Sequence, residues 1–491
     1  MKRIATVLAA LGASLAWALP ASSFDAGDVT VRGSVDGEYL HNVDLDGSVF
    51  DGRVEFGIEV GRFLLGATYR AYQLSDPGYS PAQKDIPRSE VRHRYAEFRN
   101  ESLSARAGSF FCTFGKGLAL RSYEQTDLEH DTALDGVLIG YGTGPLAFTA
   151  VSGVVSEPLS RVRTREHTVR GLEAAAAPWD WVRLSARAVE RSWEDADANL
   201  VLPPAQARRE DVVLDGAVDL WLGRVALSGE YARRDVENPV TGAEAGEGRA
   251  LYLSGTFDLG LLTLFGEFKD YDLFSHHLIN PPTCVREHPW TLMNRATYEI
   301  SLDDERGFLG EGTLPVGDAL SLTAGASEAR THSGNLSHWE IFGELSHSLA
   351  ASVSGAVAGS WSREYLLGKF TEHLIGAAEF DVELPAEQRA ELGIEIGSTD
   401  DVTGSAYTDY MGSLTWYARA DLTVSAVFER STADFEEREA WFSAELKKRL
   451  SDDVEVLFGA GTQRGGKKCA GGVCWFEPEF EGVRVRLSAY F

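Results

Sequence analysis

The sequence predicts an all-β fold: a single large antiparallel β-barrel that crosses the outer membrane of a bacterium. Three observations favour this fold. The chain begins with a segment typical of an exported protein, its remainder alternates between apolar and polar residues, and it ends in a strand pattern that finishes on an aromatic residue. A closed barrel also satisfies every backbone hydrogen bond within a membrane.

The first part of the chain has the features of a cleaved signal peptide. A basic start is followed by an apolar stretch, residues 4–15, and by small residues suited to cleavage, Ala16 and Ala18. The apolar stretch is too short to anchor the mature protein in a membrane. We therefore expect residues 1–23 to be removed and residues 24–491 to form one barrel domain.

Most of the mature sequence consists of short segments in which apolar and polar residues alternate. In residues 181–188, for example, Val182 and Leu184 share one face of a strand, while Arg183 and Ser185 share the other. Period-two alternation places one face on lipid and the other on the lumen. A soluble β-sandwich alternates in the same way, so the signal peptide and the C-terminus decide between the two folds.

The last segment resembles the terminal strand that outer-membrane barrels present to their assembly machinery, and Phe491 is the expected assembly signal. Alternation predicts a lipid-facing set (Val483, Val485, Leu487, Ala489, Phe491) and a luminal set (Arg484, Arg486, Ser488). Aromatic residues recur at segment ends, as interfacial girdles require: Tyr69, Tyr72, Trp179, Trp181, Trp221, Trp361, Trp416, Tyr417 and Trp441.

Connections between segments alternate between short and long, as expected for periplasmic turns and extracellular loops. Both chain ends should lie on the periplasmic side, so the number of strands should be even. A strand at 291–301 would place the long connection 464–476 on the short-turn side. We therefore interpret 271–305 as one excursion and predict 24 strands, within a range of 22 to 26.

Two stretches depart from simple alternation. The first contains Phe114-Gly-Lys-Gly-Leu118 and, further on, Leu134-Asp-Gly136. The second contains Phe268-Lys-Asp-Tyr271, Asn280-Pro-Pro-Thr283 and Asn294-Arg295. These motifs resemble an uncharacterised family of bacterial outer-membrane β-barrels, known as domain of unknown function 6029. The resemblance implies a barrel and no assigned activity.

Residues 88–121 are basic within an acidic chain, and the segment that follows is acidic. The expected luminal basic wall comprises Arg88, Arg92, Arg94, Arg99, Arg106, Lys116 and Arg121. The expected acidic loop partners are Asp127, Glu129, Asp131 and Asp135. Arginine–carboxylate pairs across a lumen would hold an infolded loop in place. The pattern leaves two interpretations open: a structural ion-pair network, or a charged constriction that selects solutes.

We predict that loops 112–133 and 271–305 fold into the barrel and touch each other or the basic wall, because both contain bulky aromatic residues that favour burial. The spacing Cys469-Ala-Gly-Gly-Val-Cys474 predicts a disulfide in an extracellular loop, since an exported protein meets an oxidising compartment. A bond between Cys112 and Cys284 is left open.

Composition and motifs narrow the classes of function. A net charge of −28 argues against nucleic acid as a partner. The loop histidines have irregular spacing, so we expect no metal, and no catalytic motif, enzyme activity or cofactor is predicted. The leading hypothesis is a channel or porin-like transport protein with a loop-constricted lumen. The alternative is a membrane anchor or assembly platform for a secreted or surface partner. Expected partners are outer-membrane lipid, lipopolysaccharide, the barrel-assembly machinery and an unspecified solute.

Overall fold

The computed structural model describes residues 24–26, 29–44, 46–74, 89–126, 130–160, 163–194, 208–237, 247–275, 278–296, 298, 301–317, 319–350, 352–366, 369–400, 406–434, 438–470, 473–477 and 479–491. The expected signal peptide, residues 1–23, lies outside this part. Within these ranges, no helix has both the length and the hydropathy of a membrane span.

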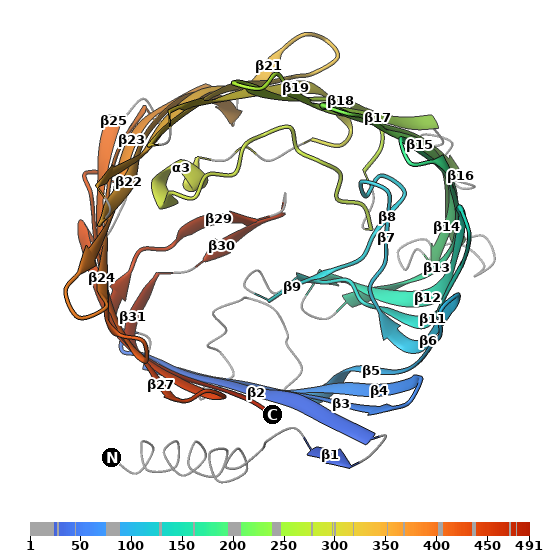
Figure 1. The fold of residues 1–491 in the computed structure, drawn as a ribbon, viewed down its shortest axis with the longest axis horizontal. Coiled ribbons are helices and arrows are strands. Elements are labelled where there is room, and N and C mark those ends of the chain that lie inside the picture. Colours follow the sequence, from blue (N-terminus) through green and yellow to red (C-terminus); the bar gives the residue numbers. More distant parts are fainter. Residues whose placement is uncertain are drawn as a thin grey trace.

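The chain forms one antiparallel sheet that closes into a barrel (Figure 1). The sheet has 25 strands, of which β1 (Phe24–Ala26) is a short addition to the start of β2. The other 24 strands close the ring, because β31 pairs with both β28 and β2. The predicted fold class and strand count are therefore confirmed.

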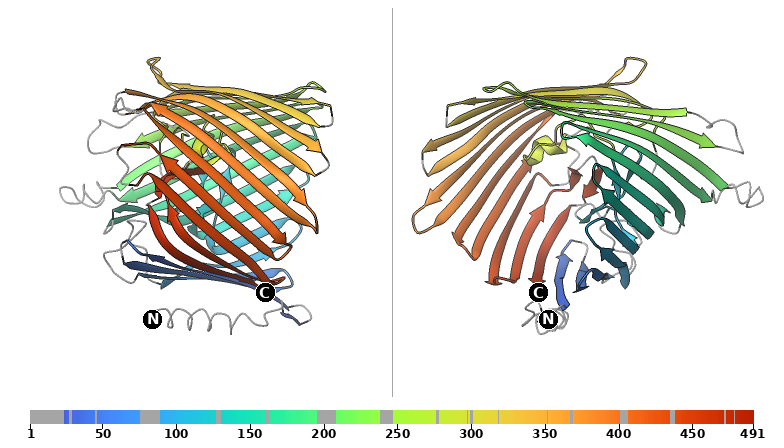
Figure 2. Two further views of the ribbon diagram at one scale, coloured as in Figure 1. Left: turned by 90° about the vertical axis from the view of Figure 1, so that its left-hand side faces the viewer. Right: turned by 45° about the vertical axis from the view of Figure 1, so that its right-hand side comes forward.

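The first twelve wall strands are β2 (Val29–Asn42), β3 (Gly47–Val60), β4 (Phe63–Leu74), β5 (Ser89–Arg99), β6 (Leu103–Phe110), β11 (Leu134–Thr143), β12 (Leu146–Ser160), β13 (Arg163–Trp179), β14 (Val182–Glu194), β15 (Arg208–Leu222), β16 (Val225–Glu237) and β17 (Glu247–Asp258). The other twelve are β18 (Thr263–Asp272), β19 (Asp304–Val316), β20 (Leu320–Arg330), β21 (Leu336–Ala350), β22 (Val353–Leu366), β23 (Lys369–Leu384), β24 (Gln388–Asp400), β25 (Ala406–Arg419), β26 (Leu422–Ser431), β27 (Ala440–Ser451), β28 (Val454–Gln463) and β31 (Phe480–Tyr490). Figure 2 shows that these strands are tilted in the barrel wall.

The connections follow the predicted alternation. Short turns, such as residues 223–224 between β15 and β16, share a rim with both chain ends, and longer connections lie at the other rim. β18 pairs directly with β19 although residues 273–303 separate them, so this stretch is one excursion. Closure is completed by two backbone hydrogen bonds between Gly33 and Phe491, with N···O distances of 2.7 and 2.9 Å.

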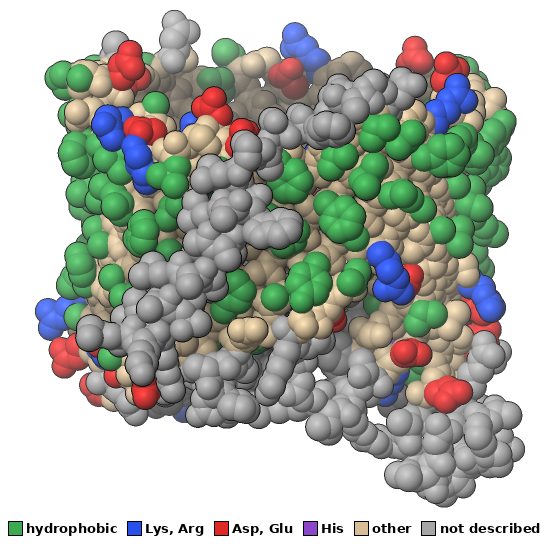
Figure 3. Space-filling model, turned by 90° about the horizontal axis from the view of Figure 1, so that it is seen from below, with side chains coloured by type: hydrophobic (Ala, Val, Ile, Leu, Met, Phe, Trp, Pro, Cys, Tyr) green, Lys and Arg blue, Asp and Glu red, His purple; other side chains and the backbone are tan. Residues whose placement is uncertain are grey.

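The outer face of the barrel is apolar. Leu172 and Leu374 are each 63% exposed, and apolar side chains gather over the outer wall in Figure 3. Among the aromatic residues expected in girdles, Trp179, Trp181, Trp221, Trp361, Trp416 and Tyr69 are exposed. An apolar exterior around a closed, charged interior is the arrangement of bacterial outer-membrane barrels. The chain is therefore an outer-membrane β-barrel.

Three aromatic residues depart from the predicted girdle, and one of them is Tyr417, which is half-buried and donates its hydroxyl to Glu391 at 3.1 Å. Tyr72 and Trp441 are buried instead of facing lipid. The indole N–H of Trp441 donates a hydrogen bond of 2.7 Å to Glu479, and the Arg464 guanidinium lies over its ring. Aromatic residues at strand ends therefore also pack inside this barrel. Their position in the sequence does not show whether they face lipid or the lumen.

Candidate functional site

A loop between β6 and β11, residues 111–133, enters the barrel (Figure 1). We name it the first infolded loop. It contains four two-residue strands: β7 (Thr113–Phe114), β8 (Leu120–Arg121), β9 (Glu124–Gln125) and β10 (His130–Asp131). These strands pair only within the loop, β7 with β8 and β9 with β10, so the loop is an ordered insert and not an extension of the wall.

A second infolded loop, residues 273–303, enters from the same rim and carries the helix α3 (Thr291–Arg295). The two loops touch. The backbone N–H of Arg121 donates to the carbonyl of Leu278 at 2.7 Å, and its guanidinium donates to the carbonyl of Asn280 at 2.9 Å. The Asn280 amide in turn donates to the Tyr123 hydroxyl at 2.8 Å. A Cβ added to Gly117 would lie 3.0 Å from the Asn280 carbonyl oxygen, so the Phe-Gly-Lys-Gly-Leu and Asn-Pro-Pro-Thr motifs lie side by side.

Both loops share an apolar core with the inner wall. Phe114, Leu118 and Leu120 of the first loop are fully buried, and Phe274 and Leu278 of the second are almost fully buried. We name this group the plug core. It packs against inward-facing wall residues, including Val151, Val169, Val189, Val213, Ala232, Ala250 and Tyr271 of β12–β18. Burying large apolar side chains stabilises the docked loops, by roughly 1.5–3 kcal/mol for each fully buried side chain.

A buried charge cluster fixes the turn of the first loop. The backbone N–H of Lys116 donates to Glu230 at 2.8 Å, and Glu230 lies 3.3 Å from the Arg187 guanidinium. Arg187 also binds Glu173 at 2.7 Å and contacts Asp215. Gly115 has a φ of +58°, and a Cβ there would overlap the Glu230 carboxylate and the Arg187 guanidinium. The Phe-Gly-Lys-Gly motif therefore needs glycine for both conformation and space.

Two ion pairs join the first loop to the wall on its other side, at β3 and β5, and we name them the wall latch. Glu124 accepts two hydrogen bonds from Arg53 of β3, at 3.0 and 2.9 Å, and Asp131 accepts one from Arg92 of β5 at 2.7 Å. The side chains of the latch are 14–24% exposed. Bidentate pairing fixes direction as well as charge, so the latch positions the loop against β3 and β5.

The environment of Asp131 keeps it ionised. Burial alone would raise its pKa, but hydrogen bonds from His93 and from the backbone N–H of Ala133, together with the charge of Arg92, hold the pKa of Asp131 well below its usual range. His93, Glu124 and Asp131 place possible metal-ligand atoms within 4.8 Å of one another. Two guanidinium groups already neutralise this set, so the arrangement fits an ion-pair network better than a cation site.

The predicted basic wall is divided in the structure. Arg92 faces the lumen and pairs with Asp131, whereas Arg94 pairs with Asp135 at 2.9 Å on the outer face, where the two side chains are 63% and 51% exposed. The cause is a β-bulge. Thr68 pairs with His93 and Tyr69 pairs with Val91, so Arg92 has no counterpart in β4. One extra residue exchanges the faces of all positions beyond it.

The remaining predicted residues have other partners. Arg106 and Arg99 both bind Glu97, Arg121 binds the second loop, and the Lys116 side chain is exposed. Within the described residues, neither Arg106 nor Arg121 pairs with Asp131 or Asp135. Glu97 lies on the same sheet and needs no loop to reach Arg106. Arg88, Asp127 and Glu129 lie outside the described residues.

Helix α3 is held by contacts that the sequence did not indicate. Glu395 of β24 accepts hydrogen bonds from the backbone N–H groups of Thr291 and Leu292, at 2.9 and 2.7 Å. Arg295 donates to Glu429 at 3.1 Å, and Arg464 binds the same carboxylate at 2.9 Å. Trp290, Leu292 and Met293 pack against Phe342, Ala358, Ile375 and Ala377 of the wall. The second loop is thus fixed to β21–β26.

The cysteines fall into two groups. Cys112 and Cys284 are free thiols, and burial raises the pKa of each to about 12. Cys469 and Cys474 face each other in backbone register across the hairpin of β29 (Gly466–Ala470) and β30 (Val473–Glu477). Their side chains lie outside the described residues, so their disulfide stays a prediction.

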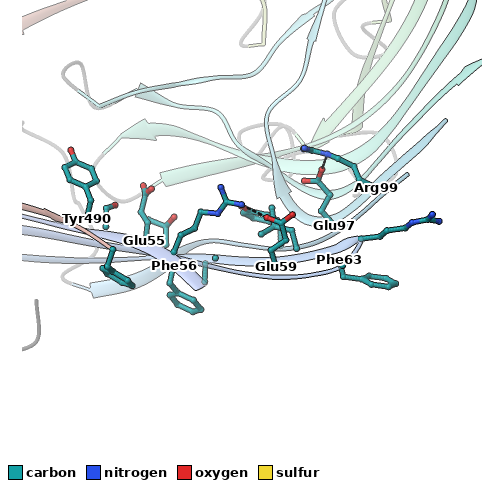
Figure 4. A pocket seen from close by; sticks show the side chains of 18 residues that line it. Glu55, Phe56, Glu59, Phe63, Glu97, Arg99 and Tyr490 are labelled. Carbon is teal, nitrogen blue, oxygen red and sulfur yellow. Dashed lines mark hydrogen bonds and ion pairs between the residues drawn. The ribbon is translucent and has the colours of Figure 1, made fainter. Parts of the chain in front are cut away.

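Two cavities adjoin β2–β5, which β6 and β11 separate from the plug-core strands. One of about 510 Å³ lies between β2–β5 and the first loop, and its lining includes Arg53, Arg92 and Glu124. The other, of about 850 Å³, lies at the end of β2–β5 nearer the chain termini. Figure 4 shows Glu55 and Glu97 pointing into the barrel at this second cavity, whereas Phe56 and Phe63 point away from it.

Comparison with known proteins identifies a family. A protein-family model described as a family of unknown function (DUF6029) matches residues 53–316, more than half of the chain. No curated protein sequence matches. Similar solved structures include the translocation pore of the P pilus usher PapC, at 11% identity, covering 94% of this chain and 99% of that chain with a TM-score of 0.46. The siderophore receptor PirA from Pseudomonas aeruginosa is 9% identical, covering 96% and 81% with a TM-score of 0.46. The copper transporter OprC is 10% identical, covering 96% and 82% with a TM-score of 0.44. At these scores, the likeness carries no information about what this barrel transports or binds.

Proposed function

We propose that this chain, which belongs to the DUF6029 family of unknown function, forms an outer-membrane channel whose lumen is narrowed by its two infolded loops. A barrel of 24 strands would otherwise enclose a wide aqueous pore. The observation that carries the proposal is the placement of the first loop. It is docked on one wall by the plug core and on the other by the wall latch, and charged cavities remain beside it.

The charges beside the docked loops fit the passage of solutes better than the role of a sealed membrane anchor. A barrel that served only as an anchor would need no charged interior beside its plug, because buried charges are costly unless they are paired. Here the cavity of about 510 Å³ beside the first loop is lined by Arg53, Arg70 and Arg92 with Asp36, Asp51 and Glu55. Such a lining suits water and small hydrophilic solutes.

Liposome swelling tests the proposal. Purified barrel in liposomes should admit small sugars and exclude larger ones, and deletion of residues 116–130 should raise the size limit. A variant with the tight extracellular loop 331–335 shortened by three residues serves as control and should keep the native limit. Circular dichroism and heat-modified gel mobility would verify that each barrel is folded. Folded barrels that admit no sugar, with or without residues 116–130, would contradict the proposal and favour the anchor function.

A further inference from the structure

The described parts of the lumen are filled unevenly. The plug core covers the inner face of β12–β18, and the residues around α3 cover β21–β23. Both contacts are apolar, with side chains at or near full burial. Water does not pass through close-packed apolar contacts of this kind. A route through the described barrel must therefore follow another wall.

The two cavities mark such a route. Both lie along β2–β5, and they share Ser34 and Glu55 in their linings. Together they extend from the rim at Gly61 and Arg62, near the chain ends, up to Glu124 of the wall latch. The wall itself is rigid, because β2, β3 and β4 pair along their full lengths. The result is a path on one side of the first loop, lined by charged side chains near the wall latch and by both charged and apolar side chains near the rim.

The charges of the smaller cavity do not balance. Its four arginines are all paired: Arg53 with Glu124 and Glu55, Arg70 with Asp51, Arg92 with Asp131 and Arg486 with Asp36. Glu38, on β2, is a fifth carboxylate in the lining, beside Asp36, Asp51, Glu55 and Glu124. Within the described residues, Glu38 makes no hydrogen bond or ion pair. Among the described residues of this cavity, Glu38 is therefore the one carboxylate available to a passing ion.

We propose that solutes cross this barrel along the β2–β5 wall and that Glu38 makes the route prefer cations over anions. The proposal rests on the channel function above and names its path and the charge class of its solutes. Paired guanidinium groups present little free positive charge to a passing ion, whereas an unpaired carboxylate in a polar cavity attracts cations and repels anions.

Reversal potentials across a planar bilayer with a KCl gradient test the selectivity. The native barrel should prefer K⁺, and Glu38→Gln should reduce the K⁺/Cl⁻ permeability ratio about tenfold. Removing one unit charge at roughly 6 Å in water lowers the permeability of K⁺ about threefold and raises that of Cl⁻ about threefold, and the ratio carries both effects. The matched control is Asp219→Asn, which neutralises a part-buried carboxylate on β15 that lies outside both cavities and is bonded to Ser228. It should leave the ratio unchanged. A native preference for Cl⁻, or equal ratios in the native and Glu38→Gln barrels, would overturn the proposal.

Thiol labelling tests the path without relying on conductance. Ser34→Cys and Glu38→Cys should react with a small water-soluble maleimide in the folded barrel, above the background of the unsubstituted protein. Val189→Cys, in the wall covered by the plug core, should stay at background until the barrel unfolds. Labelling of position 189 as fast as that of position 38 would place the water elsewhere and refute the route. A barrel that labels at position 38 but carries no current would refute the channel function instead.

Discussion

Replacing Leu118 with alanine should release the first infolded loop without unfolding the barrel. Leu118 is fully buried in the plug core, where it packs only because the loop is docked. Removing three carbons from such a site costs about 3 kcal/mol, including the cavity that is left. Since about 1.4 kcal/mol corresponds to a factor of ten, the undocked fraction of the loop should rise by roughly 100-fold.

Amide hydrogen exchange, read by mass spectrometry, measures this change. The backbone N–H groups of Arg121 and Lys116 report on docking, because they donate to the carbonyl of Leu278 in the second loop and to the Glu230 carboxylate of the wall. Their exchange should accelerate by roughly 100-fold in Leu118→Ala, while amides of β14–β16 keep their native rates. The control is Leu184→Ala on the outer face, where the side chain is 48% exposed and no loop contact is lost. Acceleration below threefold at Arg121, or equal acceleration in β14–β16, would refute the independent docking of the loop.

Three further predictions concern the latch and the cysteines. Glu124→Gln removes the loop partner of Arg53 and leaves its wall partner Glu55, so exchange near residue 124 should rise about fivefold, for a loss of about 1 kcal/mol. A difference from native that does not shrink in 1 M KCl would contradict an ionic latch. The lowered pKa of Asp131 means that its contribution to docking is present above the unfolded value near pH 4 and is lost only as pH falls through the lower folded value. Loop protection should therefore be equal at pH 7 and pH 5 after correction for intrinsic rates, and a loss within that range would show that Asp131 does not hold the loop. Because burial raises the pKa of Cys112 and Cys284 to about 12, alkylation at pH 8 should modify them only after unfolding, whereas Cys469 and Cys474 should appear as a linked pair in peptide maps. Rapid modification of Cys112 in the folded barrel, or free thiols at 469 and 474 in protein from native envelopes, would contradict these assignments.

The barrel could be predicted because its signals are local. Alternation fixes which residues face lipid, and the alternating lengths of connections fix the parity of strands, so a count of 24 followed from the sequence. The luminal positions of Arg486 and Ser488, which contact Asp36, follow from the same rule. Every lipid-facing position meets the same apolar surroundings. The alternation of apolar and polar residues is therefore enough to predict which face of each strand meets lipid.

The candidate site was less predictable, because its contacts join residues far apart in the chain. Arg53 and Glu124 are separated by 71 positions, and Lys116 and Glu230 by 114. Alternation places Arg53 and Glu230 in the lumen but does not name their partners. A signal was present in Arg187, Asp215 and Glu230, which occupy inward positions next to apolar ones in β14–β16. Buried charges among apolar neighbours require partners, and here the partners include the inserted loop.

The face of Arg94 was mispredicted for a different reason. A single bulge at Arg92 reverses the alternation for the rest of β5, and no residue type in this segment announces it. The resulting pair of Arg94 and Asp135 lies on the outer face, although each residue belongs to a set that sequence charge alone assigned to the lumen. The predicted pairing of basic with acidic residues is confirmed for Arg92 with Asp131 and for Arg94 with Asp135, but the second pair lies on the outer face and not in the lumen.

Single-channel recording from the native barrel and from the barrel lacking residues 116–130 tests the central claim most directly. If the first infolded loop narrows a conducting lumen, the native barrel should show small, uniform current steps, and the deletion should enlarge them while leaving the barrel folded by circular dichroism. Equal steps in the two proteins would show that the loop does not bound the pore. A folded native barrel that stays silent, together with a silent deletion variant, would contradict the channel itself.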